Sequence, residues 1–105
     1  MSAQGTQAIV LYPRKDGAKF DIDYYHATHM PLAKNTWTKH GLKGFTVIQL
    51  APDNQYSIAA ILDFESQEAL GNAMADPDTK KVMDDVPNFS SEKPTIVAGN
   101  VTLRG

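Results

Sequence analysis

The stretch FTVIQLAPDNQYSIAAILDF, residues 45–64, contains two runs of strand-forming residues separated by Pro52, Asp53 and Asn54. Aromatic and β-branched residues favour extended strands, whereas proline, aspartate and asparagine favour turns. Two strands joined by so short a turn pair antiparallel. The sequence therefore predicts a β-hairpin near the middle of the chain.

A strand and a helix are predicted on each side of this hairpin. Before it, TQAIVLYP predicts a strand over residues 6–12, and Asp21 is a suitable N-cap for a helix that runs to His40. After it, Ser66 can cap a helix over residues 67–75, and the helical pattern restarts at Asp76-Pro77 and continues to Asp85. The segment VPNFSSEKP is predicted to form a loop, and TIVAGNVTL predicts a last strand over residues 95–103. This order is the βαββαβ arrangement of the α+β ferredoxin-like fold, in which two helices cover one face of a four-stranded antiparallel sheet.

The predicted strands are apolar on both faces. In AIVLY, FTVI and SIAAIL the apolar residues fall on consecutive positions, whereas a sheet with one face in water shows polar residues at alternate positions. The face without helices must therefore be buried by something else, and a second copy of the chain is the simplest cover. The pattern predicts a homodimer whose sheets pack face to face.

Length and composition favour one globular domain over residues 1–105. The chain is 42% hydrophobic and 21% charged, with a formal net charge of −2 and no cysteine. Phosphate binding requires a basic stripe, so a nucleic-acid partner is not expected. The sequence contains neither a signal-peptide pattern nor an apolar run long enough to cross a bilayer, and we expect a cytoplasmic protein without a membrane partner.

One face of the first predicted helix carries a histidine at its centre. At about 100° per residue, this face contains Ile22, Tyr25, His29, Leu32, Ala33, Thr36 and His40. Pro31 has no amide hydrogen to donate to the carbonyl of Ala27, and its ring crowds that turn. We expect a kink or a local widening of the helix beside His29.

Two interpretations of His29 follow from the residues. It is either a buried structural histidine, paired with a tyrosine or a carbonyl, or a general acid or base whose proton affinity is set by apolar walls. His26 and His40 supply no third metal ligand, so no metal site is predicted. The Asp84-Asp85 pair is interpreted as surface at a helix end.

Three stretches resemble the EthD family, which is named after ethyl tert-butyl ether degradation and belongs to the dimeric α+β barrel superfamily. They are FDIDYYHATHMPLA at residues 20–33, FESQEAL at 64–70 and DDVPNF at 84–89. The resemblance implies a dimer of ferredoxin-like subunits, each with a pocket between sheet and helices. It marks His29 as the site histidine and Tyr25 as its partner, and it places Asp85, Asn88 and Phe89 at the pocket rim.

The resemblance also implies chemistry, because the family and its relatives include cyclases, dehydratases, decarboxylases and cofactor-free monooxygenases that act on aromatic or polyketide-derived compounds. We hypothesise a cofactor-independent enzyme for a hydrophobic aromatic or oxygenated compound, in degradation or polyketide-type metabolism. His29 would transfer a proton, Tyr25 would orient His29 or the substrate oxygen, and Tyr12, Trp37 and Phe89 would line the pocket. The alternatives are a non-catalytic protein that binds a hydrophobic ligand for an oxygenase system, and a purely structural dimer.

Overall fold

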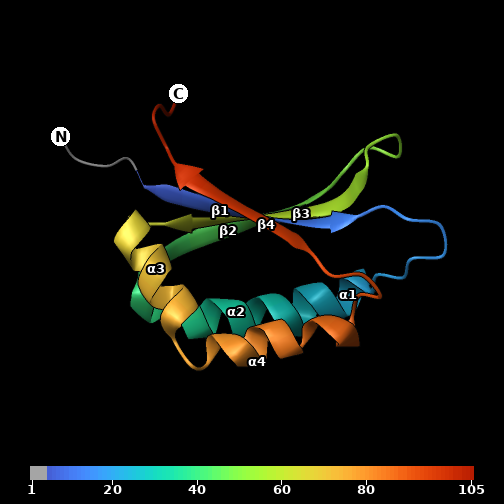
Figure 1. The fold of residues 1–105 in the computed structure, drawn as a ribbon, viewed down its shortest axis with the longest axis horizontal. Coiled ribbons are helices and arrows are strands. Elements are labelled where there is room, and N and C mark those ends of the chain that lie inside the picture. The colour runs from blue at the N-terminus through green and yellow to red at the C-terminus, as the bar shows by residue number, and fades with distance from the viewer. Residues whose placement is uncertain (1–4) are drawn as a thin grey trace.

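The computed structural model describes residues 5–105 and has the predicted ferredoxin-like fold. The strands are β1 (Thr6–Pro13), β2 (Leu42–Gln49), β3 (Tyr56–Phe64) and β4 (Thr95–Asn100). They form one antiparallel sheet in the order β2-β3-β1-β4. Figure 1 shows that the helices lie together on one side of this sheet. The single domain expected over residues 1–105 stays a prediction, and its first four residues lie outside the described range.

The first helical region contains the local widening that Pro31 predicts. It consists of α1 (Ile22–Tyr24), the π-helical segment η1 (Tyr25–His29), α2 (Met30–Trp37) and the 3-10 turn η2 (Thr38–His40). Asp21 caps its start by accepting the amide of Tyr24 at 3.0 Å. The amide of Met30 reaches back five residues to the carbonyl of Tyr25, a bond that defines a π-turn. His29 is therefore the last residue of the widened turn.

Three element boundaries differ from the prediction for local reasons. The last helix, α4 (Thr79–Asp84), begins later than Asp76-Pro77, because the side chain of Asp76 accepts the amide of Asp78 at 2.7 Å and forms a turn there. β2 begins at Leu42, which pairs with Phe64 across a bulge. β4 ends at Asn100, because Asn100 lies opposite the first residue of β1. The predicted helix α3 (Gln67–Ala75) and its Ser66 cap are confirmed, and the loop after α4 contains a short 3-10 turn, η3 (Val86–Asn88).

The two faces of the sheet differ in what covers them. The helix-facing side chains of β1 and β3 are mostly buried, among them Ala8, Tyr12, Ala60, Leu62 and Phe64. The opposite face presents an apolar patch that we call the open face, formed by Ile9, Leu11, Ile48, Ile61 and Val97. Ile48 and Val97 are 37% and 47% exposed. Within residues 5–105, no helix packs on this face (Figure 1).

No helix of the described chain is both long enough and apolar enough to span a lipid bilayer.

Gly41 ends the first helical region and turns the chain into β2. Its φ of +91° lies in the left-handed region, and its amide bonds the carbonyl of Thr38 at 3.1 Å. A β-carbon at this position would lie 2.8 Å from Cγ of Glu65 and 3.1 Å from Cβ of Ala69. Both the backbone conformation and the space require glycine here.

We predict that Gly41→Ala lowers the free energy of unfolding by about 1–3 kcal/mol, because it adds strain at a positive φ and crowds Glu65. Chemical denaturation followed by circular dichroism measures the change. Gly71→Ala is the matched control: Gly71 is exposed within α3 with open space around it, so alanine should stabilise the protein there by about 0.5–1 kcal/mol. Equal effects of the two substitutions would contradict the assignment for Gly41.

Candidate functional site

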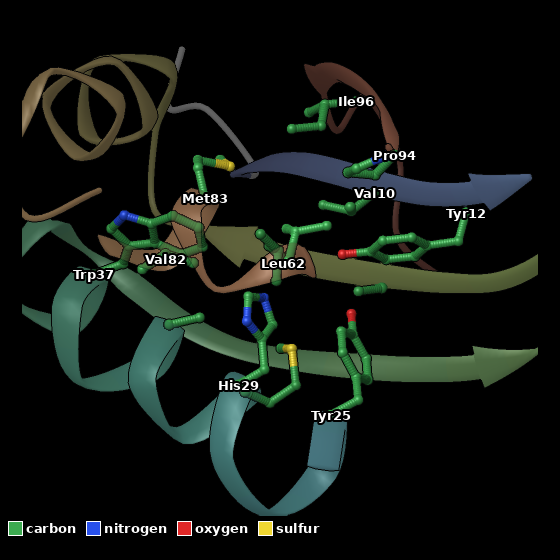
Figure 2. Close-up of a pocket in the computed structure, with 14 residues that line it drawn as sticks. Val10, Tyr12, Tyr25, His29, Trp37, Leu62, Val82, Met83, Pro94 and Ile96 are labelled. Atoms are coloured by element: carbon green, nitrogen blue, oxygen red, sulfur yellow. The ribbon is translucent and has the colours of Figure 1, made fainter. Parts of the chain in front are cut away.

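A small, mainly apolar cavity lies between the sheet and the first helical region. Its 14 lining residues come from β1, β3, β4, the first helical region and the segment around α4, and its volume is about 30 Å³. Such a volume holds roughly two water molecules. Figure 2 shows three side chains that bring polar groups to this cavity, His29 and Tyr25 from the helical side and Tyr12 from β1.

The His29 ring is fixed by a carboxylate 56 positions later in the chain. His29 is only 5% exposed, and its Nδ1 lies 2.9 Å from Oδ2 of Asp85. The π-turn aims His29 at the cavity, and the chain after α4 brings Asp85 behind the ring. The pair is thus assembled from two helical segments that only the fold brings together.

Two further residues hold the Asp85 carboxylate in place. The hydroxyl of Tyr24 donates to Oδ1 at 2.7 Å, and Nδ2 of Asn88 donates to the same oxygen at 2.9 Å. The other carboxylate oxygen of Asp85, Oδ2, accepts the hydrogen bond from His29. The carboxylate therefore accepts three hydrogen bonds, all from side chains, which restrict its rotation and favour its ionised form.

The ionisation of the pair follows from burial and these hydrogen bonds. Burial lowers the pKa of His29, and the hydrogen bond and charge of Asp85 offset only part of that shift. Burial raises the pKa of Asp85, but the hydrogen bonds from Asn88, Tyr24 and His29 outweigh it, so the net shift is downward. At neutral pH the pair is accordingly a neutral imidazole facing an ionised carboxylate.

This arrangement can supply a general base. A neutral imidazole that donates its Nδ1 hydrogen to a carboxylate has its lone pair on Nε2. Within residues 5–105, Nε2 of His29 has no hydrogen-bond partner. The free nitrogen belongs to a ring that lines the cavity, so a molecule bound there can lose a proton to it.

Aromatic side chains enclose the imidazole. The Tyr25 ring stacks on it with centroids 5.3 Å apart and planes 15° apart, and the Phe89 ring lies 4.4 Å away at 51°. Tyr25 therefore contacts His29 through ring stacking, and the hydrogen bond that orients His29 comes from Asp85. The aromatic walls exclude water and maintain the low pKa of the histidine.

The residues that sequence analysis selected divide into two groups. Tyr12, Tyr25, His29 and Trp37 line the cavity, and Nε1 of Trp37 donates to Oγ1 of Thr79 at 2.8 Å. Asp85, Asn88 and Phe89 stand behind His29 and do not line this cavity.

Sequence reasoning did not find the pairing of Asp85 or the role of Tyr24. The interpretation of Asp84-Asp85 as helix-end surface is wrong for Asp85, whose side chain is 11% exposed, and holds for Asp84, whose side chain is 62% exposed. Adjacent residues point to different sides of a helix end, and only the packing of α4 against the first helix decides which one turns inward. Tyr24 gave no signal except its place in a tyrosine pair.

The remaining histidines do not join the site. His26 is exposed, and Nε2 of His40 lies 2.7 Å from Oδ2 of Asp76 at the corner between α3 and α4. Hydrogen bonds from His40 and from the amide of Asp78 lower the pKa of Asp76 to about 2. Among residues 5–105, no three histidine, cysteine, aspartate or glutamate side chains form a group that could hold a metal ion.

Comparisons with known proteins agree with this fold. The model of the EthD domain family matches residues 16–93. An EthD-like protein from Ralstonia eutropha JMP134 is 22% identical, with 100% of this chain and 97% of that chain covered and a TM-score of 0.85. SnoaB, a cofactor-independent oxygenase from Streptomyces nogalater, is 12% identical over 98% and 100% of the two chains, with a TM-score of 0.66.

A third solved structure, a dimeric ferredoxin-like protein of unknown function from Thermobifida fusca YX, is 16% identical over 92% of this chain and 91% of that chain, with a TM-score of 0.55. No curated protein matches the chain.

We predict that Asp85→Asn lowers the pKa of His29 further, because it removes the carboxylate whose hydrogen bond and charge favour the protonated imidazole. A pH titration of the imidazole resonances by NMR measures this shift. The same substitution should lower the free energy of unfolding by about 1–3 kcal/mol, because three donors lose a charged acceptor.

Asp84→Asn is the matched control for Asp85→Asn. Asp84 is the neighbouring carboxylate, its side chain is 62% exposed, and it pairs with the exposed Lys80. We expect it to leave the His29 titration unchanged and stability within about 0.5 kcal/mol. If the His29 imidazole had the same pKa in Asp85→Asn as in Asp84→Asn, the assignment of the His29–Asp85 pair would be wrong.

Proposed function

The chain belongs to the EthD family, and we propose that it is a small cofactor-independent enzyme in which His29 takes a proton from a hydrophobic, oxygen-bearing organic compound. The observation that carries the proposal is the buried His29–Asp85 pair, whose Nε2 is free of protein partners within residues 5–105. A structural histidine would normally have both ring nitrogens paired when buried.

The proposed step begins with substrate held against the apolar walls and a carbon–hydrogen bond next to a carbonyl or a hydroxyl-bearing ring carbon directed at Nε2. Asp85 accepts the hydrogen bond from Nδ1 of His29, so it positions the imidazole and stabilises the imidazolium that forms. General base catalysis of this kind contributes about 10²–10⁴-fold in rate. SnoaB, whose fold is similar, is described as a cofactor-independent oxygenase, which supports cofactor-free chemistry for this fold.

Substrate entry requires the cavity to enlarge. Pockets for drug-sized ligands occupy about 300–1,000 Å³, far more than the roughly 30 Å³ of this cavity. Met83, Pro94 and Ile96 line it and are partly exposed, whereas the residues on the histidine side are buried. We propose that substrate enters by displacing this outer wall, since methionine adapts its shape readily.

Hydrogen–deuterium exchange tests the proposed proton transfer without knowledge of the product. Aryl ketones, 1,3-diketones and hydroxyaromatic compounds are incubated with the protein in deuterated water, and NMR measures exchange at the carbon next to the oxygen-bearing carbon. We expect the native protein to accelerate exchange of at least one class, and His29→Gln to lose about 10²-fold or more of that rate.

His26→Gln is the matched control, because His26 is an exposed histidine three residues earlier in the same π-turn. It should keep the native exchange rate. Binding of compounds without any exchange would instead support the second candidate, a non-catalytic protein that carries a hydrophobic ligand for an oxygenase system. A native exchange rate in His29→Gln would remove His29 as the base.

We also propose that two copies of the chain pack through their open faces to form a dimer. The open face is a large apolar surface without a cover in this chain, and a related fold from Thermobifida fusca is described as dimeric. Burial of about 800 Å² on each subunit is the usual size of a stable interface. Such an interface accounts for apolar residues on both faces of β1 and β3.

Sedimentation tests the dimer. We expect the native chain to sediment at twice its 11.5 kDa mass at micromolar concentration, and Ile61→Glu, which places a charge on the open face, to sediment as a monomer. Met74→Glu adds the same charge at an exposed position on α3, away from that face, and should remain dimeric. A native monomer would contradict the proposal.

A further inference from the structure

Two tyrosine hydroxyls at the cavity have no hydrogen-bond partner among residues 5–105. Tyr12 and Tyr25 are 2% and 1% exposed, and their rings meet edge to face with centroids 5.9 Å apart. Within residues 5–105, neither hydroxyl takes part in a hydrogen bond, and no unpaired side-chain nitrogen or oxygen there is fully buried, so both hydroxyl oxygens border open space at the cavity. Figure 2 shows both hydroxyls directed into the space that the His29 ring also faces.

Other polar groups nearby are paired. The hydroxyl of Tyr24 donates to Asp85, and the indole of Trp37 donates to Thr79. A hydroxyl that faces an apolar cavity is unfavourable there unless something hydrogen-bonds to it, and phenylalanine would fill either tyrosine position without bringing a polar atom to the cavity. Two such hydroxyls around one cavity therefore indicate a ligand that accepts hydrogen bonds.

The two phenols act as donors at this site. Burial raises the pKa of Tyr12 above its ordinary value, with the charges of Tyr25 and Asp85 adding to the shift, and burial also raises the pKa of Tyr25. Both groups keep their hydrogens throughout the physiological range. They can therefore donate to an oxygen atom, including one that carries a negative charge.

We infer that Tyr12 and Tyr25 form an oxyanion site, and that the substrate is a neutral ketone or phenol-like compound whose oxygen lies between the two hydroxyls. The inference rests on the proposed proton transfer at His29. With a phenol-like compound, Nε2 takes the hydroxyl proton and the electron pair of the O–H bond stays on oxygen. With a ketone, Nε2 takes the proton from the adjacent carbon, and the electrons of the carbon–hydrogen bond form a carbon–carbon double bond. The carbonyl π electrons move to oxygen, and the two phenols stabilise the resulting enolate.

The lining of the cavity supports a neutral substrate rather than a carboxylic acid. It contains no lysine or arginine, and its remaining side chains are apolar apart from the Trp37 indole and His29. Two neutral donors suit charge that develops during reaction, because they are already oriented before the charge forms. A substrate that arrives as an anion would lose its hydration without meeting a cation.

The probe for this site is 4-nitrophenol, whose absorbance distinguishes the phenol from the phenolate. At a pH where the free probe is mostly neutral, we expect binding to increase the phenolate band, because His29 takes the proton and the tyrosines hold the oxyanion. Tyr12→Phe and Tyr25→Phe should each weaken binding about tenfold or more, as expected for a hydrogen bond to a charged oxygen. Tyr56→Phe, at the start of β3 and outside the cavity lining, should bind like the native protein.

A second measurement separates this inference from the proposed catalysis. In the His29→Gln background, at a pH where the probe is already ionised, the two tyrosine substitutions should still weaken binding about tenfold. This result would hold even if no compound underwent exchange. The inference would be overturned by absence of binding at millimolar 4-nitrophenol, by binding of the neutral phenol alone, or by equal affinity in the Phe variants.

Stability provides an independent readout of the same two hydroxyls. Because neither hydroxyl has a protein partner, Tyr12→Phe and Tyr25→Phe should leave the Tm unchanged or raise it. Loss of probe affinity at unchanged or higher Tm would support a ligand-binding role. A lower Tm with unchanged affinity would instead show that the hydroxyls stabilise the fold.

Discussion

The arrangement of the site depends on the hydrogen bond between Nδ1 of His29 and the carboxylate of Asp85. A buried imidazole needs a partner, and this one comes from the end of α4, on the side of the ring away from the cavity. The bond joins the first helical region to the late loop and determines which ring nitrogen faces the cavity. Tyr24 and Asn88 restrain the same carboxylate, so the orientation of the imidazole is set by three side chains from two segments.

The cavity contains some groups that stabilise the folded protein and others that destabilise it. Its apolar and aromatic walls contribute to the core, while a histidine with a lowered pKa and two tyrosine hydroxyls without a hydrogen bond in residues 5–105 reduce the stability that the same volume could provide. Natural proteins keep polar groups at an apolar cavity where a ligand completes their hydrogen bonds. The π-turn also lowers the stability of the fold, because Pro31 removes a helical hydrogen bond beside His29.

Local sequence signals predicted most of the fold. Capping residues such as Asp21 and Ser66, the hairpin turn and the apolar strands all lie within a few positions of the structure they specify. The boundaries that differed depend on distant partners: β4 ends where β1 begins, and β2 extends because β3 reaches Phe64. These strand ends are set by pairing across the sheet, and the paired residues are too far apart in the sequence for a local pattern to predict them.

For the site, the sequence by itself determined that His29 lies on an apolar helical face beside a distorting proline, because helical periodicity and the chemistry of proline are local properties. Tertiary structure alone decided that Asp85 rather than Asp84 turns inward, that Tyr25 stacks on the imidazole instead of hydrogen-bonding to it, and that the hydroxyls of Tyr12 and Tyr25 meet at one cavity. The physical reason is that these relations join segments far apart in the chain, and only the packing of α4 and β1 against the first helical region brings them within contact distance.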